Sequence, residues 1–281
     1  MIKVLKPGLY STIQDKGRFG FQDYGVPYAG VMDAYAASVA NMLVGNDEDA
    51  AVLEMTMTGA TLQFSCDSII CVSGADMGPM LNGVSVEHDK ALPVEKDSVL
   101  SFGTLKRGFR CYVAVSGGFQ TEKIMNSRSM FHAVTKQAVI AKGDVLPIIE
   151  HSKTMLKKHA SIKMNDQYLH ANTIEVFKGA EFEKLSKAQQ EQLLSREFSI
   201  SKDNNRMAYQ LEQPLENNLE SIITSLVLPG TVQLTPSGHL IVLMRDCQTT
   251  GGYPRVLQLK ESAMNIMAQK FTGNKVCFKL V

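Results

Sequence analysis

Short runs of alternating apolar and polar residues dominate this chain. Examples are TLQFS at 61–65, RCYVAVSGG at 110–118 and KVCFKLV at 275–281, and glycine or Asp and Asn residues separate such runs. Period-2 alternation bounded by these residues is typical of β-strands joined by turns. The pattern therefore predicts a mainly β (α+β) protein, built as barrels or sandwiches with a few helices.

Three segments carry helical signals instead. The first spans 33–44, where Asp33 can cap the free amides of the first turn and Gly45 suits a left-handed exit. The second spans 186–196 and begins with capping-box spacing. The third lies near 262–270 and ends before a turn-forming stretch.

A polar, lysine-rich segment divides the chain into two strand-rich parts. Between about residues 150 and 173 the period-2 alternation is lost, and polar residues predominate. We therefore expect two domains, an N-terminal one at 1–160 and a C-terminal one at 161–281.

The composition bounds the kind of partner that the protein can have. Its 281 residues are 44% hydrophobic, and 29 basic and 28 acidic residues give a formal charge of +1. Such a balance offers no field to attract a polyanion, so we expect no nucleic-acid partner.

No apolar run approaches the roughly 18 residues that a membrane span needs, and the start lacks a signal-peptide core. We therefore expect a cytoplasmic protein with no membrane partner.

Cysteine and histidine give no sign of a metal site. The five cysteines lack C-x-x-C spacing, and the six histidines form no H-x-H or H-E-x-x-H pair. We expect buried, reduced thiols and no metal.

Several common catalytic signatures are absent from the sequence. There is no P-loop and no G-x-G-x-x-G that opens a helix after a strand. The nearest match to a serine nucleophile elbow surrounds Ser116, but Ala114 replaces its first glycine. The biotin attachment sequence A-M-K-M is also missing, so we expect no covalently bound biotin on this chain.

The segment 11–33 is the first polar cluster that could carry chemistry. It sets Gln14, Asp15 and Arg18 among four glycines, which allow a ligand to approach main-chain amides closely. Arg18 could clamp a carboxylate or phosphate with two parallel hydrogen bonds. The alternative is an elaborate turn in which Asp15 and Arg18 pair with each other.

Two further clusters contain an arginine in a polar loop. Arg128 lies in NSRSMFH at 126–132 and could bind an anion. Arg206 lies in DNNRMAYQL at 203–211. For both, a solvated loop with a structural arginine is the favoured alternative, and more strongly so for Arg206.

The stretch DCQTTGGYP at 246–254 is richer in polar groups than a hairpin turn requires. Asp246 ends a predicted strand, and Gln248, Thr249 and Thr250 supply donors and acceptors before two glycines. Such hydroxyls and amides suit a polar planar ligand, such as a ureide, a lactam or a carboxylate.

Six motifs in order along the chain carry a family resemblance. They are PGLYSTIQDKGRFGFQDYGVPYAGVMD at 7–33, ANMLVGNDEDAAVLEMTMTGATLQF at 40–64, GFRCYVAVSGGF at 108–119, NSRSM at 126–130, GTVQLTPSGHLIVLMRDCQTTGGYPRV at 230–256 and MAQKFTG at 267–273. With them the chain resembles the family that includes the C subunit of 5-oxoprolinase, the antagonist of a sporulation-kinase inhibitor, and part of the carboxyltransferase domain of urea carboxylase. The chain departs from the usual family pattern at Asn126, Met130, Ala180, Asn205 and Ala208.

The resemblance implies a fold and an assembly. The expected fold is two tandem cyclophilin-like β-barrel domains. The expected partners are an A-like hydrolase and a B-like protein, similar to the A and B subunits of 5-oxoprolinase, together with a small-molecule substrate.

The resemblance also implies an activity, with alternatives. The leading expectation is a subunit of an ATP-dependent hydrolase that opens the cyclic amide 5-oxo-L-proline to L-glutamate, with ATP used by the complex. One alternative is a carboxyltransferase component of a biotin-dependent urea carboxylase-like enzyme. The other is a regulatory binding protein that antagonises a histidine-kinase inhibitor.

Candidate site residues follow from the polar clusters and the resemblance. The candidates for catalysis, with Asp15 or Asp246 as a base, are Asp15, Asp246 and Gln248. The candidates for substrate binding are Gln14, Arg18, Arg128, Thr249, Thr250, Gly251, Gly252 and Tyr253.

Overall fold

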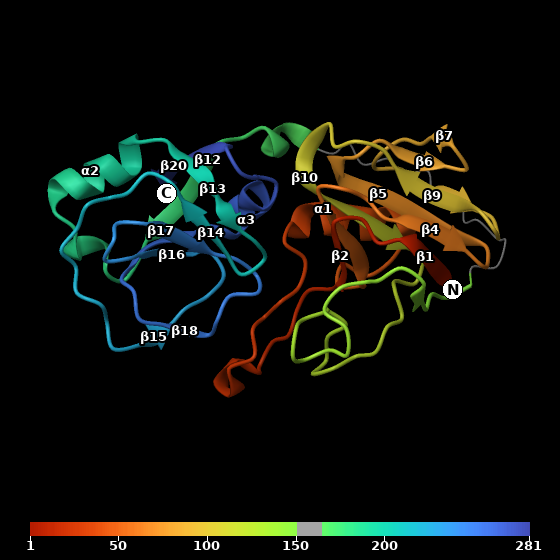
Figure 1. The fold of residues 1–281 in the computed structure, drawn as a ribbon, viewed down its shortest axis with the longest axis horizontal. Helices are drawn as coiled ribbons and strands as arrows, with labels where there is room; N and C mark the ends of the chain where they lie inside the picture. Colours follow the sequence, from red (N-terminus) through yellow and green to blue (C-terminus); the bar gives the residue numbers. More distant parts are fainter. Residues whose placement is uncertain (151–164) are drawn as a thin grey trace. The chain divides into compact units, whose positions relative to one another are not determined.

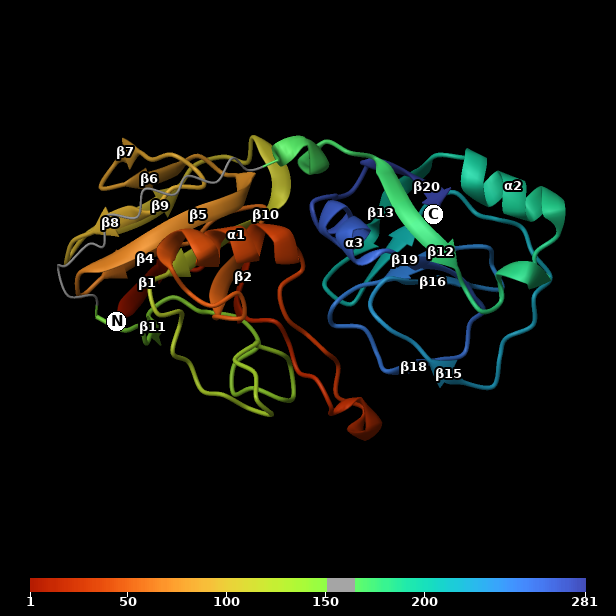
Figure 2. The same cartoon turned by 180° about the vertical axis from the view of Figure 1, so that it is seen from behind.

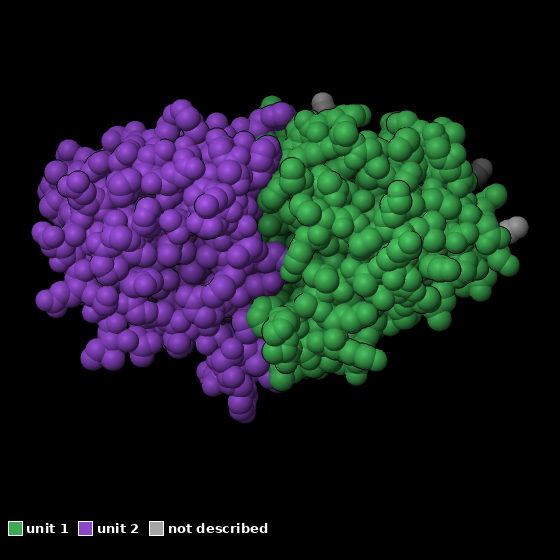
Figure 3. Space-filling model, viewed as in Figure 1, with its two compact units in different colours: residues 1–18, 29–169 green, residues 19–28, 170–281 purple. Residues whose placement is uncertain are grey.

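The computed structural model describes residues 1–150 and 165–281 and divides into two compact units. The first unit comprises Met1–Arg18 and Ala29–Leu169, and the second comprises Phe19–Tyr28 and His170–Val281 (Figure 3). The predicted domain boundary at residue 160 lies outside the described residues.

Strands form most of the regular structure in both units. In the first unit the elements are β1 (Ile2–Lys6), β2 (Tyr10–Gln14), α1 (Ala34–Val44), β3 (Val52–Thr56), β4 (Thr61–Phe64), β5 (Ser68–Asp76), β6 (Pro79–Leu81), β7 (Val84–Ser85), β8 (Leu92–Val94), β9 (Val99–Phe102), β10 (Arg107–Val115), β11 (Val145–Leu146) and η2 (Asp166–Leu169). In the second unit they are η1 (Gln22–Tyr24), β12 (Thr173–Lys178), η3 (Phe182–Lys184), α2 (Lys187–Ser195), β13 (Phe198–Asn204), β14 (Ala208–Leu211), β15 (Ser225–Leu226), β16 (Thr231–Leu234), β17 (Leu240–Leu243), β18 (Thr250–Gly251), β19 (Arg255–Leu259), α3 (Glu261–Ala268) and β20 (Lys275–Leu280). The predicted mainly β fold with a few helices is confirmed.

The first unit is two sheets that share one core. A six-stranded sheet has the order β11-β1-β4-β9-β6-β7, and a five-stranded sheet has the order β2-β3-β10-β5-β8. Apolar side chains of both sheets, such as Val4 and Phe64 from one and Leu53 and Val113 from the other, form a single buried cluster. Helix α1 packs on β5 and β10, so it covers the other face of the five-stranded sheet (Figure 2).

Strand β10 is covered on both faces, which explains the continuous apolar run in its sequence. Cys111, Val113 and Val115 belong to the core between the sheets, whereas Tyr112 and Ala114 belong to the cluster beneath α1. Because successive side chains of a strand point to opposite faces, a strand that is covered on both faces has no exposed polar positions.

The helix ends follow the signals in the sequence. Asp33 caps α1, its carboxylate accepting a hydrogen bond from the Ala36 amide, and Gly45 ends the helix at φ 77°. At α2 the capping box of Ser186 and Gln189 is formed, with both reciprocal bonds present. The three helix predictions are confirmed.

The second unit is a closed seven-stranded barrel. Its strand order is β12-β19-β16-β17-β14-β13-β20, and β12 and β20 pair in parallel to close it (Figure 1). Inward side chains such as Ile174, Val232, Val242 and Phe278 are fully or almost fully buried. The barrel expected for the C-terminal part is therefore present, while the strands of the first unit form the two sheets described above.

A two-stranded ribbon lies outside the sheet of the barrel. Strand β15 pairs with β18, so that Ser225 faces Gly251 and Leu226 faces Thr250. Buried Val227, just after β15, joins Leu243 and Cys247 in a small apolar cluster that anchors the ribbon.

Candidate functional site

Asp15 is the centre of a buried hydrogen-bond cluster in the first unit. Its Oδ1 accepts hydrogen bonds from the Gly17 amide at 2.9 Å, the Ser127 hydroxyl at 2.6 Å and the Ser129 hydroxyl at 2.7 Å. Its Oδ2 accepts from the Arg128 amide at 2.5 Å. These four donors, rather than the Arg18 guanidinium considered as an alternative, are the partners of this carboxylate among the described residues.

The loop around Ser127 and Ser129 is fitted to Asp15. The Asp15 amide donates to the Ser129 hydroxyl at 3.0 Å, and the Ser129 amide donates to the Ser127 hydroxyl at 3.0 Å. Asn126 enters this loop at φ 61°, a left-handed conformation that asparagine tolerates better than most residues. Two polar clusters that are more than a hundred residues apart in the sequence thus form one structure.

The two arginines predicted to bind an anion are directed into the unit itself. Arg18 is fully buried, and its Nη2 donates to the Ser129 carbonyl. Arg128 donates from Nη1 to the Thr121 carbonyl and from Nη2 to Gln120 Oε1 at 2.8 Å. In this structure both guanidinium groups therefore tie loop backbone together.

Gln14 is likewise held by neighbouring groups. Its Nε2 donates to Thr12 Oγ1 at 3.0 Å and to the Met130 carbonyl at 3.1 Å, and its Oε1 accepts from the Gly30 amide at 3.0 Å. Gly30 has φ 89°, and a Cβ there would lie 2.9 Å from the Lys16 carbonyl oxygen. Glycine is therefore required at this close approach of two loops.

In the second unit, Asp246 forms a bidentate ion pair with Arg206. Arg206 Nε donates to Asp246 Oδ2 at 2.9 Å, and Nη2 donates to Oδ1 at 2.8 Å. The Asp246 amide also donates to the Arg206 carbonyl at 2.9 Å. Arg206 is buried and Asp246 is nearly so, which places a charge-assisted pair at the start of the polar stretch.

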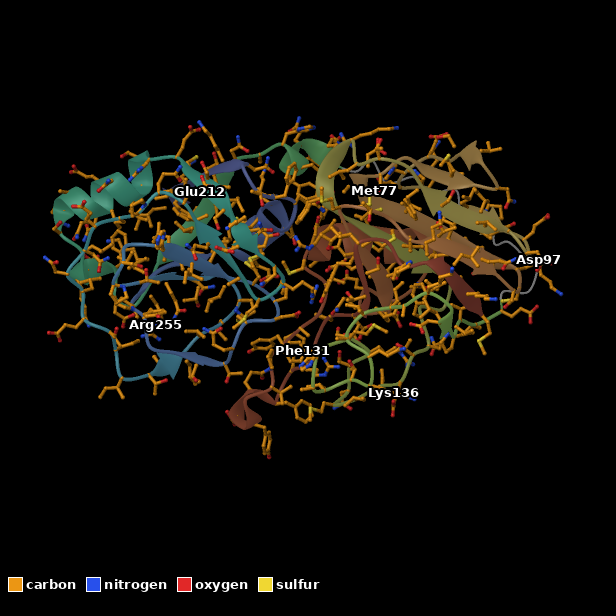
Figure 4. All side chains as sticks on the ribbon, viewed as in Figure 1. Met77, Asp97, Phe131, Lys136, Glu212 and Arg255 are labelled. Atoms are coloured by element: carbon orange, nitrogen blue, oxygen red, sulfur yellow. The ribbon has the colours of Figure 1, made fainter. Side chains whose placement is uncertain are left out.

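A second bidentate pair holds the other end of that stretch. Arg255 (labelled in Figure 4) donates from Nε and Nη2 to the two carboxylate oxygens of Glu181, both at 3.0 Å. The hydrogen bond with Arg255 holds the pKa of Glu181 below its ordinary value. Arg255 Nη1 also donates to the Leu226 carbonyl at 3.1 Å, which connects this end to β15.

Residues 248–253, named here the QTTGGY segment, lie between these two pairs. Thr250 is exposed, Thr249 is partly exposed, and Tyr253 is 39% exposed. A Cβ at Gly251 would lie 2.5 Å from Gln233 Nε2, so the glycine lets the segment lie close to the Gln233 side chain of β16. Gln248 Oε1 is buried without a hydrogen-bond partner among the described residues. The segment thus presents hydroxyl and backbone groups on a base that is fixed at both ends.

The thiol next to the QTTGGY segment is in its protonated form. Burial raises the pKa of the Cys247 thiol to about 12, so it is protonated at neutral pH. Within residues 1–150 and 165–281, no three His, Cys, Asp or Glu side chains are grouped as metal ligands.

The described helices include none with the length and apolar character of a membrane span.

Sequence reasoning assigned Arg206 mainly to a solvated loop and did not identify Glu181, Arg255 or Gln233. A signal existed for Arg255, which follows the polar stretch directly. Its partner Glu181 precedes it by 74 positions and has no local signature.

A second network of buried polar groups in the first unit was also missed. Tyr112 donates its hydroxyl to Glu54 Oε2 at 2.8 Å and accepts from the Asp33 amide at 2.8 Å. Burial raises the pKa of Tyr112 well above its ordinary value. The Tyr168 hydroxyl donates to Asp33 Oδ2 at 2.7 Å. This network fixes the start of α1 on the sheet beneath it.

The candidate residues therefore form two groups, one in each unit. Gln14, Asp15, Arg18 and Arg128 come together around the Ser127–Ser129 loop. In the second unit, Asp246 pairs with Arg206 just before the QTTGGY segment, which includes strand β18 of the ribbon.

Comparison with known proteins gives a family match and several relatives for this chain. Residues 24–280 match the family described as "Carboxyltransferase domain, subdomain A and B". The C subunit of 5-oxoprolinase from Escherichia coli (strain K12) is 33% identical over 284 residues, which cover 99% of this chain and 90% of that protein. The urea amidolyase of Saccharomyces cerevisiae is 35% identical over 161 residues, which are 55% of this chain and 9% of that protein.

A solved structure supports the fold. The protein TTHA0988 superposes with a TM-score of 0.87 at 23% identity over 99% of this chain. The matched region is 55% of the TTHA0988 chain, so the present chain spans about half of its length. Together, the full-length relative and the family match show that the chain belongs to the carboxyltransferase-domain family, subdomains A and B.

Proposed function

We propose that this chain is a subunit of an ATP-dependent 5-oxoprolinase complex, which converts 5-oxo-L-proline, ATP and water to L-glutamate, ADP and phosphate. The observation that carries the proposal is the 33% identity with the C subunit of 5-oxoprolinase over 90% of that protein. A match over so much of both chains includes both units and each of the polar clusters.

The QTTGGY segment is suited to a cyclic amide. A lactam has one carbonyl acceptor and one N–H donor, and threonine hydroxyls can serve either group. Thr249 and Thr250 supply such hydroxyls, and Gln248 adds an amide side chain. Their contribution to the reaction is positioning and polarisation of the amide carbonyl, because donors held in place need no reorganisation as charge develops.

The two candidate bases have contacts that favour another role. Asp15 accepts four hydrogen bonds, and Arg206 occupies both oxygens of Asp246. A carboxylate whose oxygens are engaged in this way is held by its own loops and is not free to contact a substrate. We assign Asp15 and Asp246 to positioning of their loops.

ATP supplies the free energy for ring opening in this proposal, and no residue of this chain is assigned to it. The guanidinium groups of Arg18 and Arg128, considered for an anion, donate to Ser129, Thr121 and Gln120 of the same unit. We propose that the A-like hydrolase and the B-like protein complete the complex in the cytoplasm, where ATP is available.

Reconstitution tests the proposal directly. The chain is mixed with the A-like hydrolase and the B-like protein of the same organism, 5-oxoproline and ATP are added, and glutamate and phosphate are measured. We expect glutamate and phosphate in equal amounts, and none when this chain is omitted. A folded, assembled complex that forms no glutamate would contradict the proposal.

A carboxyltransferase component is the second candidate, and the match to urea amidolyase favours it. Urea also has an amide carbonyl next to N–H, so the same hydroxyls could hold it. The test is transfer of a labelled carboxyl group from a carboxybiotin protein to urea in the presence of this chain. Transfer to urea, with no glutamate formed in the first assay, would select this candidate.

A further inference from the structure

Large aliphatic side chains are exposed on β15 and on the residues that flank it. Leu226 is 70% exposed and Leu228 is 50% exposed, while Val227 between them is buried. Ile223, just before β15, is fully exposed. This is the alternation of a strand with one covered face, but the solvent side carries leucines where polar residues are usual.

The ribbon also lacks other support on its outward side. It contains two strands, each with one unpaired edge among the described residues. Two-stranded ribbons are marginally stable in water and gain stability when they pack against another surface. Grouped apolar side chains on such an element are a feature of protein interaction sites.

The part of the chain that carries β15 is acidic in sequence. From Leu211 to Met244 the sequence contains glutamates but no lysine or arginine. Glu216 and Glu220 are exposed on the segment that leads to Ile223. Arg255, which donates to the Leu226 carbonyl, is paired with both oxygens of Glu181 and adds no net charge.

We propose that Ile223, Leu226 and Leu228 form a docking surface for the B-like protein of the complex, whose contact face is then apolar with lysine or arginine at its rim. The proposal rests on the proposed function for the identity of that partner. Leu226 lies opposite Thr250 in the ribbon, so an occupant of this surface would border the QTTGGY segment.

Binding of the B-like protein, measured by calorimetry without ATP or 5-oxoproline, tests the surface. Leu226→Asp is expected to raise the Kd by about tenfold or more, because central apolar contacts dominate interface affinity. Glu220→Lys is expected to raise the Kd by roughly threefold and to reduce the dependence of the Kd on salt concentration. The matched control is Phe177→Asp, an apolar residue that is 48% exposed on β12, with a change below about twofold expected for a side chain outside the interface.

A labelling experiment establishes whether the surface is free before binding. Leu226→Cys should react with a maleimide in the isolated chain and be shielded in the complex, with the modified site identified by mass spectrometry. Thermal unfolding of each variant confirms that it is folded. Shielding already in the isolated chain, equal effects of Leu226→Asp and Phe177→Asp, or no binding by the wild-type chain would each overturn the proposal.

The outcomes separate this proposal from the proposed function. If the complex depends on Leu226 but forms no glutamate, the docking surface stands and the 5-oxoprolinase function fails. If glutamate is formed while Leu226→Asp binds as the wild type does, the function stands and the docking surface fails.

Discussion

The two polar regions of this protein use similar residues in opposite ways. Around Asp15, the polar side chains and both arginines are directed inward, and their hydrogen bonds join loops of the first unit. In the second unit, the strong interactions lie at the two ends of the QTTGGY segment, and the residues between them include exposed Thr250 and Tyr253.

This difference separates residues that build a site from residues that can touch a ligand. A buried carboxylate with four donors has its hydrogen-bonding capacity satisfied within the protein, so its replacement should lower stability. A segment held at both ends and open in the middle can lose a hydroxyl at little cost to the fold.

The largest effect is expected from Asp15→Ala. Removal of the carboxylate leaves two hydroxyls and two amides in a buried cluster without their acceptor, which should lower the free energy of unfolding by about 4 kcal/mol. Urea denaturation followed by circular dichroism measures the change. Asp49→Ala, at an exposed position of the same unit, is the control, with a change within about 0.5 kcal/mol. A loss below about 1 kcal/mol for Asp15→Ala would show that the cluster is not a structural centre.

Arg206→Ala should have the next largest effect. It leaves the Asp246 carboxylate without its bidentate partner in a nearly buried position, at an expected loss of about 3 kcal/mol. The matched control removes an exposed pair: Lys275→Ala leaves Glu197 in water and should cost about 0.5 kcal/mol or less. In the double variant Arg206→Met/Asp246→Leu both charges are gone, so the loss should be smaller than in the single variant. A larger loss in the double variant would refute this account of the pair.

The double variant Thr249→Val/Thr250→Val should change activity more than stability. Valine keeps the shape of threonine and removes the hydroxyl, so the free energy of unfolding should change by less than about 1 kcal/mol. If the hydroxyls hold the substrate, kcat/KM of the reconstituted complex should fall by about tenfold or more, since one lost hydrogen bond to the reacting amide is worth about that factor. Thr104→Val, at an exposed position of the first unit, is the control. Unchanged activity would assign the segment to the scaffold alone.

Much of the fold was predictable because its signals are local. The cap residues Asp33 and Ser186 and the exit at Gly45 mark the ends of two helices, and period-2 alternation marks the strands. The arrangement of strands was less accessible, because pairings such as β12 with β20 join segments about a hundred residues apart. Register between such segments depends on packing in three dimensions, which a single sequence does not display.

The candidate site was predictable as a set of residues but not as a set of contacts. Local composition identified Asp15 and Asp246, and both lie in polar clusters of the structure. The sequence offered Arg18 as the partner of Asp15, whereas the structure uses Ser127 and Ser129 from a distant loop. Side-chain pairing across the chain has no signature in spacing, so the roles of these residues required the structure.

The smallest predicted effect concerns the ion pair at the end of the QTTGGY segment. The hydrogen bond with Arg255 holds the pKa of Glu181 below its ordinary value of 4.5. A carboxyl group whose pKa is lower in the folded state stabilises the fold above its unfolded pKa, and this stabilisation is lost as the pH falls through the folded pKa. Glu181→Gln should therefore be less stable than the wild type by about 1 kcal/mol at pH 7, and the difference should shrink as the pH falls below 4.5. Denaturation of both proteins across this pH range measures it, with Glu183→Gln, from the exposed pair with Lys178, as a control for which a smaller difference is expected. A difference that does not change with pH would mean that Glu181 stabilises the segment through neutral hydrogen bonds rather than through its charge.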